Sequence, residues 1–381
     1  MRFEQESAMN IRKFAQIAGL VSRRDSRLKA TKKSRQRIQL DFMPEGLEKR
    51  QLLATFNYNS GTGLLAVETS QNSETLSIVS ASDAGNYTIV TSGIWSGTST
   101  ADVGNSGTNL FVNSTANISL IQITNNAANS GSAFYFGSST VNFVDNLSVN
   151  FSNSSSGVIT VANATSFVNG SNLNLTSTGN QITVSSPTSA NSTGAISLTG
   201  RNIVVRGNIT ANAGDITLYG NGGGVYQTGP FDGVWINGAG VYVNTTGGNI
   251  TIDGRGGLNT ACFGVQLSSS KVQAGGSGCV TITGVSGDGS QGVAHGISLS
   301  GAIDTANSGS IIFNGTSYGT GTFSVGVTLS GSANISATGA GNVTITGFAL
   351  QGTSSARGIN VSNSWLMLAC RVVTEISVTC F

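Results

Sequence analysis

The sequence predicts an all-β protein whose main part is a parallel β-solenoid with three short strands per coil and a right-handed turn. Three observations lead to this fold. Charged residues make up only 9% of the 381 residues, against about 25% in compact soluble domains. Glycine is abundant at 52 residues, proline occurs 3 times, and the apolar residues fall in short β-branched runs, as strands require. The third observation is a repeat with a period of about 31 residues.

The repeat is visible in three registers. In the first, a glycine, one further residue and a β-branched strand recur at steps of 34, 30, 31 and 32 residues, beginning at Gly214, Gly248, Gly278, Gly309 and Gly341. A second strand follows a glycine at Gly233, Gly264, Gly296, Gly326 and Gly358, and a third strand centres on Val241, Val272, Ile303 and Ile335. Three registers that share one period predict a regular β-solenoid over residues 194–361.

Apolar residues alternate along these strands, so that one face of each strand is expected to be buried. In the first strand Ile250 and Ile252 point inward and Thr251 points outward. The same alternation predicts inward pairs in the second strand, namely Val265 and Leu267, Ile297 and Leu299, Val327 and Leu329, and Ile359 and Val361. Glycine at the strand entrances provides either φ freedom or a close approach of the backbone where the chain turns a corner. Because one coil buries few side chains, the coils must stack in order to fold.

A compact coil of about twenty residues precedes the regular repeat, with expected strands at 195–198, 202–205 and 208–211. The later coils are about eleven residues longer, mostly between their first and second strands, as in 219–232 and 284–295. These extra loops should project from one flank of the solenoid. Since binding residues concentrate on loops that a rigid scaffold positions, this long-loop flank is the expected place for any partner.

The segments on either side of the repeat follow no clean period. Residues 55–193 contain short strand-like runs, which we interpret as degenerate coils of the same solenoid, with a separate β-sandwich cap as the alternative. Residues 362–381 depart from the pattern altogether. This tail is either a capping strand that shields the last coil or the product of a truncated or shifted reading frame.

The charge is distributed unevenly between the N-terminus and the body. Residues 1–50 carry 13 Lys and Arg against 6 Asp and Glu, whereas residues 51–381 carry 6 against 11. The body therefore lacks the basic surface that nucleic-acid binding requires. Residues 1–54 are expected to form a basic leader that is disordered or partly helical, without an apolar run long enough for a transmembrane span or an ordinary signal peptide.

The end of this leader carries a short motif. Leu47, Glu48, Arg50, Leu52 and Leu53 occupy the fixed positions of an LExRxLL element, at the change from the basic segment to the Gly- and Asn-rich body. In this the chain resembles exported and surface proteins of planctomycetes, which implies an extracellular or cell-surface location. The Gly-x-Ile-Thr-Ile coils are similar to the β-helices of filamentous haemagglutinins and autotransporters, and that resemblance concerns architecture alone.

Few residues are suited to catalysis or metal binding. His295 is the only histidine, which excludes a His-based triad or a multi-His metal site, and its position between a loop and a strand predicts an exposed side chain. The four cysteines have no CxxC spacing. Cys262 and Cys279 fall in neighbouring coils, so a disulfide between them stays open. We therefore expect no metal and no cofactor.

The acidic residues of the repeat are scattered singly. A glycosidase needs two carboxylates about 5 to 9.5 Å apart, which in a solenoid means acids that share one column in adjacent coils. Asp215, Asp253, Asp288 and Asp304 do not form such a pair, and Asp253 with Arg255 is the nearest approach to a catalytic cluster. We expect no catalytic residues and no enzyme activity.

The function predicted from these features is that of a non-catalytic exported repeat protein with a structural or adhesive role. Its expected partners are surface glycans or other extracellular matrix components, bound through the long-loop flank. The alternative is a carbohydrate-active β-helix enzyme, either a polysaccharide lyase or a hydrolase, that uses acids on that flank.

Overall fold

The structure is a computed structural model that describes residues 53–69, 74–81, 85–125, 131–137, 140–152, 157–221, 227, 229–258, 262–288, 292–305, 309–331, 333–338, 340–352, 355–362 and 376–380. These residues belong to one compact unit, Gln51–Phe381. The other unit, Met1–Arg50, lies outside the described residues, and with it most of the expected leader and its motif. Within the described ranges all regular structure is β-strand, as the predicted fold class requires.

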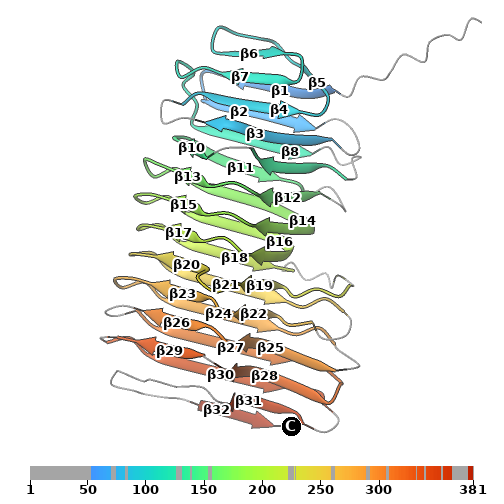
Figure 1. Ribbon diagram of the computed structural model, residues 1–381, viewed down its shortest axis with the longest axis vertical. Coiled ribbons are helices and arrows are strands. Elements are labelled where there is room, and N and C mark those ends of the chain that lie inside the picture. Colours follow the sequence, from blue (N-terminus) through green and yellow to red (C-terminus); the bar gives the residue numbers. More distant parts are fainter. Residues whose placement is uncertain are drawn as a thin grey trace, which may run out of the picture. The chain divides into compact units, whose positions relative to one another are not determined.

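The strands of successive coils pair in parallel and form long ladders along the stack (Figure 1). The first ladder contains β8 (Leu120–Asn125), β11 (Asn146–Asn150), β14 (Leu173–Val184), β16 (Ile196–Val205), β18 (Ile216–Gly220), β21 (Ile250–Arg255), β24 (Val280–Val285), β27 (Ile311–Ser317), β30 (Val343–Ala349) and β32 (Ile376–Cys380). The second contains β9 (Ala133–Phe136), β12 (Val158–Val161), the C-terminal halves of β14 and β16, β19 (Val234–Asn237), β22 (Val265–Ser268), β25 (Val293–Leu299), β28 (Phe323–Ser330) and β31 (Arg357–Ser362). The third is a separate sheet of β10 (Val141–Phe143), β13 (Thr165–Phe167), β15 (Thr188–Ala190), β17 (Ile209–Ala211), β20 (Tyr242–Thr245), β23 (Lys271–Ala274), β26 (Ala302–Thr305) and β29 (Asn334–Ala337).

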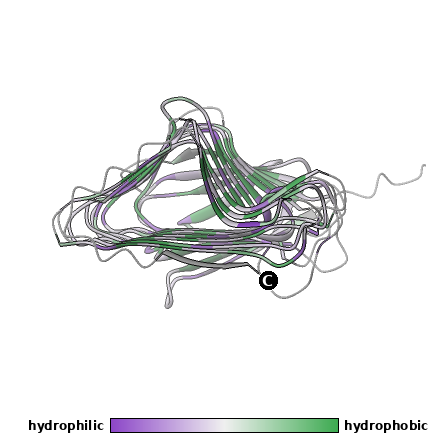
Figure 2. Ribbon diagram, turned by 90° about the horizontal axis from the view of Figure 1, so that it is seen from below, coloured by the Kyte–Doolittle hydropathy of each residue, from purple (hydrophilic) through white to green (hydrophobic). Residues whose placement is uncertain are grey.

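The observed pairing confirms two of the three predicted registers. In the first ladder Ile216, Ile250, Val280, Ile311 and Val343 are successive partners. In the second ladder the successive partners are Val234, Val265, Ile297, Val327 and Ile359. Figure 2 looks along the stack, where the strands of successive coils superpose into faces that enclose the interior.

The third register was predicted two residues too early in its first coil. Val243, rather than Val241, pairs with Val272. The connection between β19 and β20 spans four residues, whereas that between β22 and β23 spans two. Gly238 and Gly240 in this longer turn have φ of 134° and 83°, values that suit glycine. The two extra residues of this turn shift the strand by two positions. Val241 and Val243 are also two positions apart, so both point inward, and both are buried.

Residues 55–193 contain parallel coils and, before them, antiparallel strands that belong to the same sheet as the coils and not to a separate β-sandwich. From β8 onward the strands pair in parallel as further coils. Before β8 the chain forms antiparallel pairs among β1 (Leu53–Asn59), β2 (Leu64–Thr69), β3 (Thr75–Ala81), β4 (Tyr87–Thr91), β6 (Val103–Ser106) and β7 (Asn109–Val112), with β5 (Ile94–Ser96) parallel to β1. β2 and β3 also pair in parallel with β8 and β9. These antiparallel strands therefore cover the edge that the first coil would otherwise expose.

The last coil of the second strand ladder differs from the coils before it. The expected inward pairs from Val265 to Leu329 are at most 2% exposed. In the last coil the prediction is wrong, because Val361 is 53% exposed and Ile359 is only partly buried. No described strand of the second ladder follows β31, so this pair lacks the next coil that covers its equivalents elsewhere. The tail nevertheless includes β32, which extends the first ladder by pairing Ile376 with Ile345.

The strand-entrance glycines are needed because two backbone segments approach each other closely there, and not because of φ freedom. Gly254, at the end of the first strand, faces Gly264 at the start of the second, and a Cβ on Gly254 would collide with the Gly264 carbonyl oxygen. Neither residue has a φ in the left-handed region. The same pairing recurs between Gly220 and Gly233, Gly284 and Gly296, Gly315 and Gly326, and Gly347 and Gly358. We call this column of pairs the glycine neck, because each long loop leaves and re-enters the coil there.

Candidate functional site

The first long loop turns part of the solenoid surface into a groove. On the outer side of the second ladder Gln181 pairs in register with Asn202, and Thr183, Val204 and Trp235 follow one another in a neighbouring column. Ile203 and Val205 point into the core and are fully buried, so alternation places Asn202 and Val204 on the outside. Both are nevertheless buried, at 6% and 7% exposure. Other residues therefore lie over them, and Pro230, Phe231 and Asp232 line the same hollow as both.

Residues 229–232 provide this cover and form the wall of the groove. Two adjoining hollows of about 330 and 320 Å³ lie between this wall and the strands, and both are lined by Gln181, Asn202, Pro230 and Phe231. Each is within the size range of small-molecule sites. The sequence contains no motif for this groove, because its residues come from three successive coils.

Contacts to the next coil hold the wall in place. The Phe231 carbonyl oxygen accepts a hydrogen bond from the Gly257 amide at 2.9 Å, and the Phe263 amide donates to Oδ1 of Asp232 at 2.8 Å. A Cβ on Gly257 would lie 2.7 Å from the Phe231 ring, so the glycine makes room for that ring. The wall is therefore part of the stack of loops. It is held in position before a ligand binds, which lowers the ordering cost of binding.

Two arginines flank the groove and lie on aromatic rings. The guanidinium carbon of Arg201 is 5.2 Å from the centre of the Phe231 ring, and that of Arg206 is 5.6 Å from the centre of the Trp235 ring. Both distances are within the range of cation–π interactions. Neither arginine forms an ion pair with a described residue, since the only ion pair between two described residues joins Lys271 and Asp304. Both positive charges are therefore available to an anion.

The groove also contains polar atoms that lack a partner. Oδ1 of Asn202 and Nε of Arg201 are buried and form no hydrogen bond with the described residues. Asp232 is the carboxylate among the described lining residues. Burial raises the pKa of Asp232 to about 6, against a smaller lowering by the hydrogen bond from Phe263. Burying a donor and an acceptor without hydrogen-bond partners costs free energy. A bound ligand that offers an acceptor to the one and a donor to the other would remove that cost.

His295 lies in β25 and is buried, so the prediction of an exposed loop residue was wrong. Its side chain is 9% exposed and its ring stacks on Phe263 with 5.3 Å between centroids. The strand begins at Val293, earlier than its apolar pattern indicated, and pairs there with β28. Burial lowers the pKa of His295 to about 4. The residue is therefore a neutral packing group at physiological pH.

The buried neutral His295 makes stability depend on pH. The unfolded chain binds a proton at this histidine below about pH 6.5, whereas the folded chain does so only below about pH 4, so stability falls as the pH is lowered through this window. Asp232 acts in the opposite direction, because its raised pKa removes stability as the pH rises from about 4 to about 6.

Comparison with His295→Gln isolates the histidine, because Asp232 is present in both proteins. We expect the difference in unfolding free energy between wild type and variant to shrink by up to about 3 kcal/mol between pH 7 and pH 4. Urea titrations at several pH values measure it. A difference that stays constant with pH would contradict the assignment.

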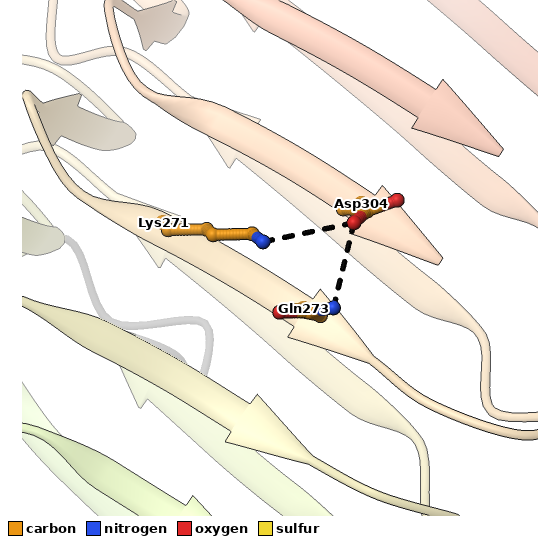
Figure 3. A network of polar contacts seen from close by, with 3 residues as sticks. All are labelled: Lys271, Gln273 and Asp304. Atoms are coloured by element: carbon orange, nitrogen blue, oxygen red, sulfur yellow. Dashed lines mark hydrogen bonds and ion pairs between the residues drawn. The ribbon is translucent and has the colours of Figure 1, made fainter. Parts of the chain in front are cut away.

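The acids that the sequence singled out lie in separate places. Asp215 accepts a hydrogen bond from the Asn249 amide at 2.7 Å. Asp304 on β26 contacts Lys271 at 3.6 Å and Gln273 at 3.4 Å on β23 (Figure 3). Asp253 is half-buried on β21, on the same outward side as Arg255, and burial raises its pKa. Among the described residues no group of three or more His, Cys, Asp or Glu side chains is placed to hold a metal ion.

No disulfide joins Cys262 and Cys279, so the bond that the sequence left open does not form. Cys262 is buried in the long-loop flank, 3.7 Å from the Gly229 carbonyl oxygen. Cys279 lies at the corner before the first strand, where its sulfur accepts a hydrogen bond from the Ser310 amide at 3.4 Å. The two thiols therefore belong to different corners of the coil.

Comparisons with known proteins add no relative to this description. No protein-family model, no curated protein and no solved structure matches the chain. Separately, the described part of the chain holds no helix that is both long and apolar enough to span a membrane.

Proposed function

We propose that this chain is a non-catalytic exported repeat protein of the cell surface or exterior, with a structural or adhesive role. The observation that carries the proposal is that polar side chains at one corner join successive coils. A column of side chains at the corner before the first strand illustrates this, in which each accepts a hydrogen bond from the backbone of the following coil. Its members are Asn146, Asn172, Asp215, Asn249, Cys279 and Ser310.

This column supports a structural role for the protein, because its side chains accept hydrogen bonds from backbone amides that no strand ladder pairs. Oδ1 of Asn249 accepts from the Cys279 amide at 3.0 Å, and Oδ1 of Asn172 accepts from the Ala195 amide at 2.8 Å. Buried or half-buried backbone amides at corners need such partners. The column breaks at Ala195, whose methyl group cannot accept a hydrogen bond. The column contains a single carboxylate, Asp215, so it offers no pair of acids of the kind that a glycosidase needs.

The alternative function, a polysaccharide lyase or hydrolase, has one observation in its favour. Asp232 lies in a groove and has a pKa raised to about 6, which is typical of a general acid. A glycosidase needs a second carboxylate within about 9.5 Å, and the described lining residues include none besides Asp232. We therefore favour the non-catalytic role.

Cell fractionation together with a glycan-cleavage assay tests the proposal. We expect the full chain in the surface or extracellular fraction of the producing cells and no turnover of any polysaccharide in a panel. The variant with both Leu52 and Leu53 changed to Ala should stay inside the cell, because it lacks the two leucines that end the leader motif. Cytosolic wild-type protein would contradict the location, and cleavage of any glycan would contradict the non-catalytic role.

A further inference from the structure

We propose that the groove between β16 and residues 229–232 binds a glycan through a carboxylated sugar, with Arg201 and Arg206 as the carboxylate-binding groups. This inference rests on the proposed adhesive function and names the ligand class and the site. Its basis is the combination in one groove of two unpaired guanidinium groups, an unpaired amide oxygen and a wall held in place by the next coil.

The arginines determine the charge of the ligand. The guanidinium carbons of both arginines lie over aromatic rings, and the planar edge of a guanidinium group matches a carboxylate with two parallel hydrogen bonds. Arg201 lies near the middle of β16, and Arg206 directly follows the strand. Arg201 lines one of the two hollows and Arg206 lines the other, so a ligand that fills both hollows contacts both arginines.

The floor of the groove determines that the ligand carries hydroxyl groups. Oδ1 of Asn202 needs a donor, and Nε of Arg201 needs an acceptor. Gln181 lies next to Asn202 in the ladder. Its Oε1 accepts a hydrogen bond from the Thr183 hydroxyl at 3.1 Å, and its amide nitrogen is a further donor. Sugar hydroxyls donate and accept, so an acidic sugar satisfies all of these atoms. A phosphodiester backbone offers acceptors alone, and the net charge of the body, with 6 basic and 11 acidic residues after position 50, disfavours nucleic acid.

Titration calorimetry of the full chain with trigalacturonate, its methyl ester and neutral galactotriose tests the inference. We expect trigalacturonate to bind, and the two neutral compounds to bind about tenfold to a hundredfold more weakly, because hydrogen bonds to charged groups are the strong ones. Equal binding of the methyl ester would overturn the role of the arginines. Binding of a sulfated galactotriose without binding of trigalacturonate would overturn the assignment to a carboxylate.

Variants of the arginines locate the site. Arg206 is exposed, so Arg206→Gln should fold normally and weaken trigalacturonate binding at least about tenfold. Arg206→Lys keeps the charge but loses the planar fork, and we expect an intermediate loss. The matched control is Arg357→Gln, since Arg357 is an exposed arginine on β31 that contacts Asn360 outside the groove. An equal loss in Arg357→Gln, or no loss in Arg206→Gln, would overturn the site.

These results separate the inference from the proposed function. Cleavage of trigalacturonate would contradict the non-catalytic role while leaving the groove as its binding site. A surface location without trigalacturonate binding would leave the scaffold role intact and overturn the groove assignment. Circular dichroism and the unfolding midpoint of each variant show whether a loss of binding is a loss of folding.

Discussion

Gly264→Ala should lower the free energy of unfolding by about 3 kcal/mol, the upper end of the usual cost of inserting atoms into a packed region. Gly264 is part of the glycine neck, and a Cβ there would lie 2.5 Å from the Gly296 carbonyl oxygen and 2.7 Å from the Gly284 carbonyl carbon, besides meeting the Val285 amide nitrogen. All three are backbone atoms of the next coil. They cannot move aside without disturbing the β24 and β25 ladders, which also pair with the coil beyond.

Gly104→Ala is the matched control for this prediction. Gly104 lies in β6, has no heavy atom within 4 Å of an added Cβ and has no left-handed φ. Alanine there should leave stability unchanged or raise it by a few tenths of a kcal/mol, because it restricts the unfolded chain. Urea unfolding of both variants measures the difference. Equal midpoints for the two variants would show that the glycine neck is not a close-packed feature.

Phe143→Ala should destabilise the protein by about 3 to 5 kcal/mol. Phe143 is fully buried in β10, and its ring stacks on Phe167 with 4.8 Å between centroids and on Tyr87 with 5.7 Å. Phe136 packs against the same ring edge-on at 6.1 Å. Because Tyr87 belongs to the antiparallel strands and Phe167 to the parallel coils, the cavity would weaken the junction between them.

Phe111→Ala is the control, since Phe111 in β7 is 42% exposed. Its loss should cost less than about 1 kcal/mol, as for most exposed substitutions. Tyr87 provides a second readout of the Phe143 cavity. Its hydroxyl donates a hydrogen bond to Oδ2 of Asp145 at 2.6 Å, and hydrogen exchange in β4 should accelerate when Phe143 is removed. If Phe143→Ala lost much of its stability while hydrogen exchange in β4 stayed unchanged, the weakened region would not be the junction at Tyr87.

The periodic part of the fold could be predicted because each of its requirements is local. Alternation places Ile250 and Ile252 on one face wherever a strand forms, and both are fully buried. The glycine neck requires glycine at Gly254 and Gly264 because of backbone contact, so the spacing of such glycines marks the period of the repeat. The centre of the third strand was placed at Val241, two residues too early. A two-residue insertion in the turn leaves the alternation of apolar residues unchanged, so the pattern does not reveal it.

The sequence pointed to the long-loop flank, but the residues of the groove could not be predicted, because they depend on which loop covers which strand. Gln181 and Trp235 are 54 positions apart, and nothing near either residue marks it as part of a site. His295 was misjudged for the same reason: its exposure depends on the Phe263 ring in the preceding coil. No local pattern records such a neighbour.

The sequence by itself determined the all-β solenoid, its period and two of its three strand registers. These depend on side-chain alternation and on glycine at the neck, which are properties of single strands and corners. Only the tertiary structure decided that antiparallel strands cover the first coil, that Cys262 and Cys279 stay apart, and that Arg201 and Arg206 flank a groove. Each of these depends on how segments from different coils stack. A small insertion, such as the one in the turn 238–241, changes which residues are neighbours.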